Sequence, residues 1–133
     1  MATVMADTSA IYALLDRSDA NHSKAVDLLK QIRAAGDTLI VTDLVVAETH
    51  ALILSKLGPD LARSWLVELC WPVERVTEED EERAREITCA YEDKSFSYTD
   101  ATSFAVMERL GISVAFAFDR HFTQFGFSLV GES

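Results

Sequence analysis

The sequence predicts an α/β fold: one α/β/α sandwich in which helices cover both faces of a short, mostly parallel β-sheet. Short runs of apolar, often β-branched residues alternate along the chain with longer segments whose apolar residues recur at helical spacing. This alternation is typical of parallel strands joined by helices. The chain has 133 residues and 49% of them are hydrophobic, which suffices for one core but not for two ordinary domains. We therefore expect residues 1–133 to form a single domain.

The first half of the chain predicts two strands and four helices, separated by glycine, proline and capping residues. Asp43 is a candidate N-cap, and Gly36 and Gly58 are candidate helix stops. Pro59 suits the first turn of a helix, because its missing N–H needs no partner there. In order, the expected elements are a strand at Thr3–Asp7, helices at Thr8–Asp16 and Asp19–Gly36, a strand at Thr38–Thr42, and helices at Asp43–Gly58 and Pro59–Trp71.

The second half predicts three further strands and two helices. Thr77 is a candidate N-cap, and Ser97 precedes Asp100 in the S-x-x-D pattern of a capping box. From Asp100, helical spacing reaches Phe104 and Met107, so this acid lies beside a stripe that should be buried. The expected elements are a strand at Val73–Val76, helices at Thr77–Asp93 and about Phe96–Gly111, and strands at Ser113–Phe118 and Phe127–Val130.

The charge balance argues against direct contact with nucleic acid. Twelve Lys and Arg stand against 22 Asp and Glu, a formal net charge of −10. A protein that holds nucleic acid through its phosphates usually presents a basic surface. A bound divalent cation would bridge this acidic chain to a polyanion, and the acidity equally suits a basic protein partner.

The sequence predicts a cytoplasmic protein without a membrane segment. The N-terminal segment has no basic region and Asp7 interrupts its apolar part, so it does not resemble a signal peptide. The longest apolar runs, such as Val114–Phe118, are far shorter than the roughly 18 residues of a membrane helix. Cys70 and Cys89 lie in apolar sequence without CxxC spacing, and we expect them to be buried free thiols in a reducing compartment.

Four acids occupy notable places in this layout. Asp7 ends the first strand, Asp119 ends the strand at residues 113–118, and Asp100 opens a helix. Ligands of parallel α/β sheets bind at the carboxyl ends of the strands. Glu48 lies one turn inside a helix, on a face that it shares with apolar residues, and no Lys or Arg lies within one turn of it. An isolated charge in such a setting is costly, so we expect Glu48 to have a partner.

Each of these acids also has a purely structural interpretation. Asp7 can cap the following helix, Asp100 can complete its capping box, and Asp119 can serve as a turn or cap residue. Taken singly, none of the acids identifies a site.

Together, the order and context of the four acids resemble those of a PIN domain. The motifs are Asp7 in MADTSAIYALL, Glu48 in LVVAETHALI, Asp100 in SYTDATSFAVM and Asp119 in FAFDRHF. More closely, the chain from about Val4 to Val130 resembles the small VapC-type toxin ribonucleases of type II toxin–antitoxin pairs.

This resemblance implies a metal-dependent endoribonuclease that cleaves RNA, is restrained by a cognate antitoxin protein, and forms a homodimer. It assigns Asp7, Glu48, Asp100 and Asp119 as catalytic residues and metal ligands. Hard oxygen ligands favour Mg²⁺, with Mn²⁺ as a substitute, over zinc. One ion or two are both compatible with four acids. The alternative is a catalytically inactive PIN-like module that binds an antitoxin-like partner.

Other phosphate chemistries fit the sequence less well. A haloacid-dehalogenase-like phosphatase needs a second Asp two positions after the first, where this chain has Ser9. A response-regulator receiver needs a Lys late in the chain, and none follows Lys94.

Neighbouring residues receive weaker assignments. Hydroxyl groups that could position ligands or water, with capping as an equal alternative, belong to Thr8, Ser9 and Thr99. Residues expected to be solvated at the surface, the last four with contact to phosphate as the alternative, are His22, Arg17, Lys94, Arg120 and His121. Residues expected in the core or at an interface are Trp65, Leu69 and Trp71.

Overall fold

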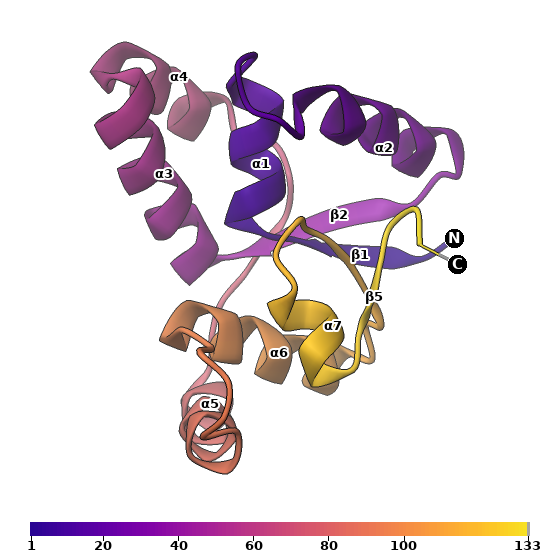
Figure 1. Ribbon diagram of the computed structural model, residues 1–133, viewed down its shortest axis with the longest axis vertical. Helices are drawn as coiled ribbons and strands as arrows, with labels where there is room; N and C mark the ends of the chain where they lie inside the picture. Colours follow the sequence, from indigo (N-terminus) through magenta and orange to yellow (C-terminus); the bar gives the residue numbers. More distant parts are fainter. Residues whose placement is uncertain (133) are drawn as a thin grey trace.

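Five short strands form one sheet, and every pairing in it is parallel. The computed structural model describes residues 1–132. The strands are β1 (Thr3–Ala6), β2 (Thr38–Thr42), β3 (Val73–Glu74), β4 (Val114–Phe116) and β5 (Ser128–Leu129). Their order across the sheet is β3-β2-β1-β4-β5, and Figure 1 shows β1 and β2 side by side at its centre. Because β1 and β4 are parallel neighbours, their carboxyl ends lie at the same edge of the sheet.

Helices cover both faces of this sheet, which confirms the predicted fold class. They are α1 (Thr8–Leu15), α2 (His22–Ala34), α3 (Asp43–Leu57), α4 (Pro59–Glu68), α5 (Glu78–Ala90), α6 (Tyr98–Leu110) and α7 (His121–Phe125). Figure 1 shows α1 and α2 on one side of the sheet, with α5, α6 and α7 on the other.

The alternation of side chains along β1 produces two separate cores. Val4 and Ala6 pack with Ile11 on the face covered by α1 and α2. Met5 points to the opposite face and packs in a second cluster with Phe104. Both faces of β1 are therefore buried, as a central parallel strand requires.

The predicted elements are present, but several are shorter than expected and one helix was missed. The strands at the two edges of the sheet, β3 and β5, have only two residues each. Residues 121–125 form the short helix α7, which the periodicity did not reveal because a five-residue helix contains little more than one turn. Its fully buried Phe122 anchors it in the second core.

The expected helix caps are confirmed with one correction. Thr77 and Ser97 each cap a helix in a complete capping box. The N-cap of α3 is Thr42, not Asp43, and its hydroxyl oxygen accepts a hydrogen bond from the Val45 amide at 3.1 Å. The Asp43 carboxylate instead accepts from the Val76 amide at 2.9 Å, which ties the start of α3 to the segment after β3.

The expectation of buried thiols was wrong. Cys70 and Cys89 are free, as predicted, but both are exposed. Cys89 lies on the outer face of α5, whose buried face consists of other residues, and Cys70 follows the end of α4. Across residues 1–132, none of the helices combines the length and the apolar character that crossing a membrane would require.

Candidate functional site

The carboxyl edge of the sheet brings Asp7 and the segment after β4 together. Asp7 directly follows β1, and its backbone amide donates a hydrogen bond to the Phe116 carbonyl at the end of β4, at 3.0 Å. Asp119 follows three residues later. This is the edge at which the sequence predicted a ligand site.

Asp7 is a buried N-cap of α1. Its carboxylate accepts hydrogen bonds from the Ser9 amide at 3.2 Å and from the Ser9 hydroxyl at 2.7 Å. The same hydroxyl accepts from the Phe118 amide at 3.0 Å, so Ser9 links Asp7 to the loop that carries Asp119. Asp7 therefore caps α1, as the sequence suggested. Capping alone does not require burial near other acids, yet Asp7 is only 5% exposed.

The pKa of Asp7 is raised to about 6. Burial is the main cause, because desolvation penalises the charged form. The two hydrogen bonds from Ser9 act in the opposite direction, and the negative charges of Asp100 and Asp119 raise the pKa further. The structure thus brings these three acids within electrostatic reach of one another.

Asp100 is held by its capping box and by a histidine. One of its carboxylate oxygens, Oδ2, accepts from the Ser97 amide at 3.0 Å and lies 2.6 Å from Nδ1 of His121. Asp100 is buried, and so are Phe104 and Met107 on the stripe below it, as the helical spacing predicted.

Asp119 meets the same histidine. Its Oδ1 accepts from the His121 backbone amide at 2.8 Å and lies 3.1 Å from His121 Nδ1. Asp100, Asp119 and His121 each offer a ligand atom, and these three atoms all lie within 4.8 Å of one another. The expectation that His121 is a solvated surface residue was therefore wrong. The motif DRHF contains this histidine, but its separation of 21 positions from Asp100 conceals their contact.

Glu48 differs from the other three predicted acids. It is exposed, so the expected apolar setting was wrong; the buried side chains of α3 are Val45, Thr49 and Ile53. Glu48 does lie in the turn of α3 that meets the start of α1, because the neighbouring Thr49 hydroxyl donates to the Thr8 hydroxyl at 3.1 Å. Neither Glu48 nor Asp7 is a member of the close group formed by Asp100, Asp119 and His121.

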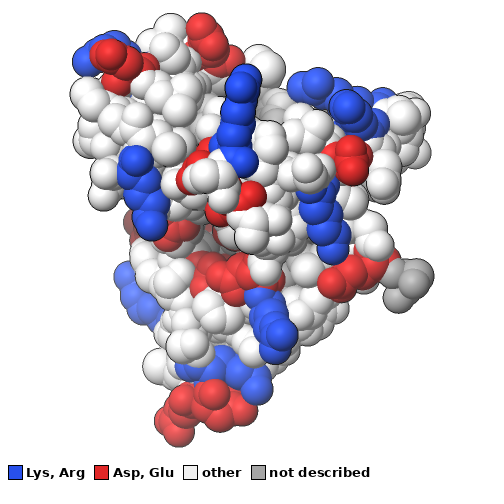
Figure 2. All heavy atoms as spheres, turned by 45° about the horizontal axis from the view of Figure 1, so that its top comes forward, with Lys and Arg blue, Asp and Glu red and all other residues white. Residues whose placement is uncertain are grey.

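No ion pair with a basic side chain balances the charge of these acids. Figure 2 shows acidic side chains gathered in a recess near the middle of the molecule, with separate Lys and Arg side chains around it. In residues 1–132, no Lys or Arg forms an ion pair with Asp7, Asp100 or Asp119. The negative charges of the site are therefore balanced only by hydrogen-bond donors, a setting that favours a bound cation.

The remaining polar residues near the site have mostly structural contacts. His22 starts α2, and its Nδ1 lies 2.8 Å from the Ala13 carbonyl of α1, so it joins two helices and does not face the acids. Lys94 pairs with Asp93 at 3.1 Å. Arg17 and Arg120 are exposed, as expected. Arg120 and Lys24 both line a hollow of about 400 Å³ beside Asp119.

Comparison with known proteins agrees with this geometry. Residues 4–128 match the family model of the PIN domain. The 23S rRNA-specific endonuclease VapC20 of Mycobacterium tuberculosis is 34% identical over 128 residues, which cover 93% of this chain and 95% of that protein. Ribonuclease VapC26 of the same organism is 28% identical over 121 residues, covering 88% of this chain and 87% of the relative.

Solved structures lead to the same group. The crystal structure of M. tuberculosis VapC20, described as a sarcin–ricin loop cleaving toxin, superposes with a TM-score of 0.83 over 93% of this chain and 95% of that one. FitAcB from Neisseria gonorrhoeae superposes with a TM-score of 0.73 over 96% of each chain, and at 14% identity it shows the fold alone. The chain therefore belongs to the PIN-domain family, among its VapC-type ribonuclease toxins.

Proposed function

We propose that the protein is a metal-dependent endoribonuclease whose cation is held by Asp7, Asp100 and Asp119, with Glu48 completing the site. The observation that carries this proposal is the grouping of acids at the carboxyl edge of the sheet: Asp7 is buried there near Asp100 and Asp119, and in residues 1–132 no Lys or Arg pairs with any of the three. Buried negative charges placed near one another destabilise the folded protein unless a cation binds among them. The fold alone would not need such a cation.

The donor set fits Mg²⁺, with Mn²⁺ as a substitute. Carboxylate oxygens are hard ligands, and the group at Asp100 and Asp119 is compact enough for one ion to reach both. Glu48 is exposed on α3, and the contact of the neighbouring Thr49 with Thr8 supports its place at the edge of the site. The bound cation would lower the pKa of a coordinated water and polarise the scissile phosphate.

The residues of this chain supply orientation and charge. Ser9 fixes the carboxylate of Asp7, and the capping box fixes that of Asp100, so both carboxylates are held in place before RNA arrives. Three acids on an acidic protein repel the phosphate backbone, so RNA is expected to bind productively only when the cation is present. The reaction is hydrolysis: water attacks phosphorus and the 3′-oxygen leaves.

We further propose that the substrate is a structured ribosomal RNA loop. The support is the 34% identity to a relative named as 23S rRNA-specific and described as cleaving the sarcin–ricin loop. That loop is the first RNA to test, beside a transfer RNA of similar length.

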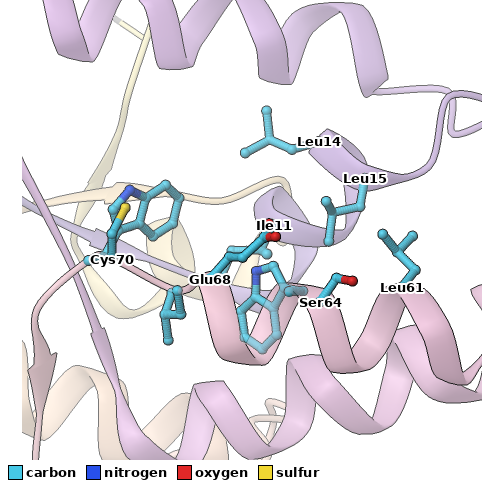
Figure 3. Close-up of a pocket in the computed structure, with 10 residues that line it drawn as sticks. Ile11, Leu14, Leu15, Leu61, Ser64, Glu68 and Cys70 are labelled. Atoms are coloured by element: carbon cyan, nitrogen blue, oxygen red, sulfur yellow. The ribbon is translucent and has the colours of Figure 1, made fainter.

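An antitoxin protein is the expected partner, and an apolar groove between α1 and α4 offers it a place. The groove has a volume of about 270 Å³. Figure 3 shows Leu14 and Leu15 of α1 facing Leu61 and Ser64 of α4 across it. Trp65, Leu69 and Trp71, expected in the core or at an interface, are partly buried against the first core and also line this groove. An apolar segment of the antitoxin would fill the groove, and an Arg beside it would neutralise the acids. A complex in which no antitoxin segment approaches Asp7 or Asp100 would refute this placement.

The catalytically inactive alternative predicts the same partner but no chemistry. Homodimerisation stays a prediction, which light scattering of the purified protein would test.

The decisive experiment for the activity is incubation with a sarcin–ricin loop RNA in Mg²⁺, in Mn²⁺ and in EDTA, followed by sequencing of the cleavage ends. We expect cation-dependent cleavage with 5′-phosphate and 3′-hydroxyl ends. Undiminished cleavage in EDTA, or 2′,3′-cyclic phosphate ends, would exclude the metal-water mechanism.

A further inference from the structure

His121 lies between two of the proposed cation ligands. Its Nδ1 is 2.6 Å from Asp100 Oδ2 and 3.1 Å from Asp119 Oδ1. The hydrogen bond is the one to Asp100: an ionised carboxylate only accepts, so Nδ1 is its donor. Asp119 Oδ1 lies close to the same nitrogen. His121 therefore contacts two acids that belong to different elements, the start of α6 and the loop before α7.

His121 is itself held in place by a backbone contact and by a ring contact. The His121 backbone amide donates to Asp119 at 2.8 Å, which fixes the start of α7 against the Asp119 side chain. The ring also meets the Phe96 ring edge to face, with a centroid distance of 5.5 Å. The side chain is only 23% exposed, so most of its surface lies against neighbouring residues that limit its movement.

We propose that His121 is a positioning residue for the cation site: its Nδ1 binds Asp100 and lies against Asp119, and so bridges the two carboxylates in the convergent arrangement that a divalent ion requires. Without this bridge the two negative charges would repel each other, and Asp119, which sits in a loop, would move more easily than Asp100, which is buried in a helix start. This inference rests on the proposed function, because it assumes that the two acids bind a cation.

The chain contains a matched control histidine. His22 also starts a helix and also uses Nδ1, but its partner is the Ala13 carbonyl, and it holds α1 against α2. Loss of His22 should therefore affect stability, whereas loss of His121 should affect the cation. Partners that orient a metal ligand typically contribute about 10- to 100-fold to metal affinity or activity.

The test is calorimetric titration of Mn²⁺ into the full-length parent protein and three variants, each first shown to be folded by circular dichroism. His121→Phe keeps a ring against Phe96 and removes the donor. His121→Asn keeps a donor near the position of Nδ1. His22→Phe is the control.

We expect His121→Phe to bind Mn²⁺ about tenfold or more weakly than the parent. His121→Asn should recover most of that loss, and His22→Phe should bind like the parent. Parent-like affinity in His121→Phe, or equal losses in the Phe and Asn variants, would overturn the proposal. A direct Mn–nitrogen coupling in pulsed electron paramagnetic resonance would also overturn it, since His121 would then be a ligand. A parent protein that binds no Mn²⁺ would instead refute the proposed function, and this inference with it.

Discussion

Asp80 and Asp100 occupy the same position in two adjacent helices, yet they have different surroundings. Each is the third residue of its helix, and each completes a capping box with the hydroxyl residue before that helix, Thr77 or Ser97. Their exposed fractions are also similar, 3% and 7%. From local sequence and burial alone the two acids cannot be told apart.

The two acids differ in the side chains that they contact. The Arg109 guanidinium binds Asp80 with Nη2 at 2.9 Å and Nε at 3.0 Å. Burial pushes the pKa of Asp80 upward, but the hydrogen bonds from Arg109 and Thr77 outweigh it and hold that pKa below its usual value. Asp100 has no such cation. It meets His121, and its charge helps to raise the pKa of Asp7.

The comparison shows that a capping box does not by itself distinguish a structural acid from a site acid. A buried carboxylate whose charge is neutralised by Arg supports the fold, whereas one that faces further carboxylates leaves negative charge for a ligand to balance.

The largest effect should come from Asp100→Asn. The amide can still accept the Ser97 hydrogen bond, so the metal-free protein should melt near the parent temperature. Removal of one ligand charge should reduce RNA cleavage roughly 100-fold or more. It should also abolish most of the stabilisation by added Mg²⁺, because ligand binding raises the stability of the native state. Thermal unfolding with and without Mg²⁺ measures the stabilisation by the ion, and an RNA cleavage assay measures the activity. Parent-like cleavage by this variant would remove Asp100 from the site.

The second effect is the pH dependence of stability at Asp7, measured in EDTA. The folded pKa of Asp7, about 6, lies above the ordinary value of 3.8, so ionised Asp7 destabilises the fold. This penalty is absent below about pH 4, grows as the pH rises to about 6, and then stays constant. Asp7→Asn should therefore be more stable than the parent by up to about 3 kcal/mol at pH 7, and the difference should vanish towards pH 4. Denaturant unfolding at several pH values checks it, and a pH-independent difference would contradict the shifted pKa.

Asp80→Asn should have the opposite consequence for stability. This substitution removes the charge that Arg109 binds and should cost about 2 kcal/mol at pH 7. Because the pKa of Asp80 is lowered, its stabilisation is present above the ordinary value and is lost as the pH falls through the folded pKa, so the cost should shrink in acid. Cleavage and the response to Mg²⁺ should stay at the parent level. A loss of Mg²⁺ response in this variant would show that the two acids are not functionally distinct.

The smallest effects should come from the caps themselves. Thr77→Ala and Ser97→Ala each remove one capping hydroxyl and should each cost about 1 kcal/mol in the free energy of unfolding. Only Ser97→Ala should also reduce cleavage, because the hydroxyl and amide of Ser97 help to fix Asp100. Equal cleavage by both variants would mean that the cap of α6 does not support the site.

Much of the fold was predictable because it rests on local patterns. Apolar periodicity, Gly58, the Thr77 cap and the Ser97 capping box placed most elements within a few residues, and parallel strand order placed Asp7 and Asp119 at one edge. The family resemblance is confirmed. The contacts that depend on distant residues were not predictable: the bridge from His121 to Asp100, the exposure of Glu48 and the exposure of both thiols. Each of these depends on how helices pack, which spacing along one helix does not specify.

Locating the cation tests most directly whether Asp7, Asp100 and Asp119 hold a metal ion. Crystals of the protein soaked in Mn²⁺ would be measured at the manganese absorption edge. We predict an anomalous peak between Asp7, Asp100 and Asp119, with carboxylate oxygens at about 2.1 Å and with Glu48 nearby or linked through water. No peak should lie at Asp80, where Arg109 already occupies the carboxylate. A fully soaked crystal without a peak at the three acids, or with its strongest peak elsewhere, would contradict the account.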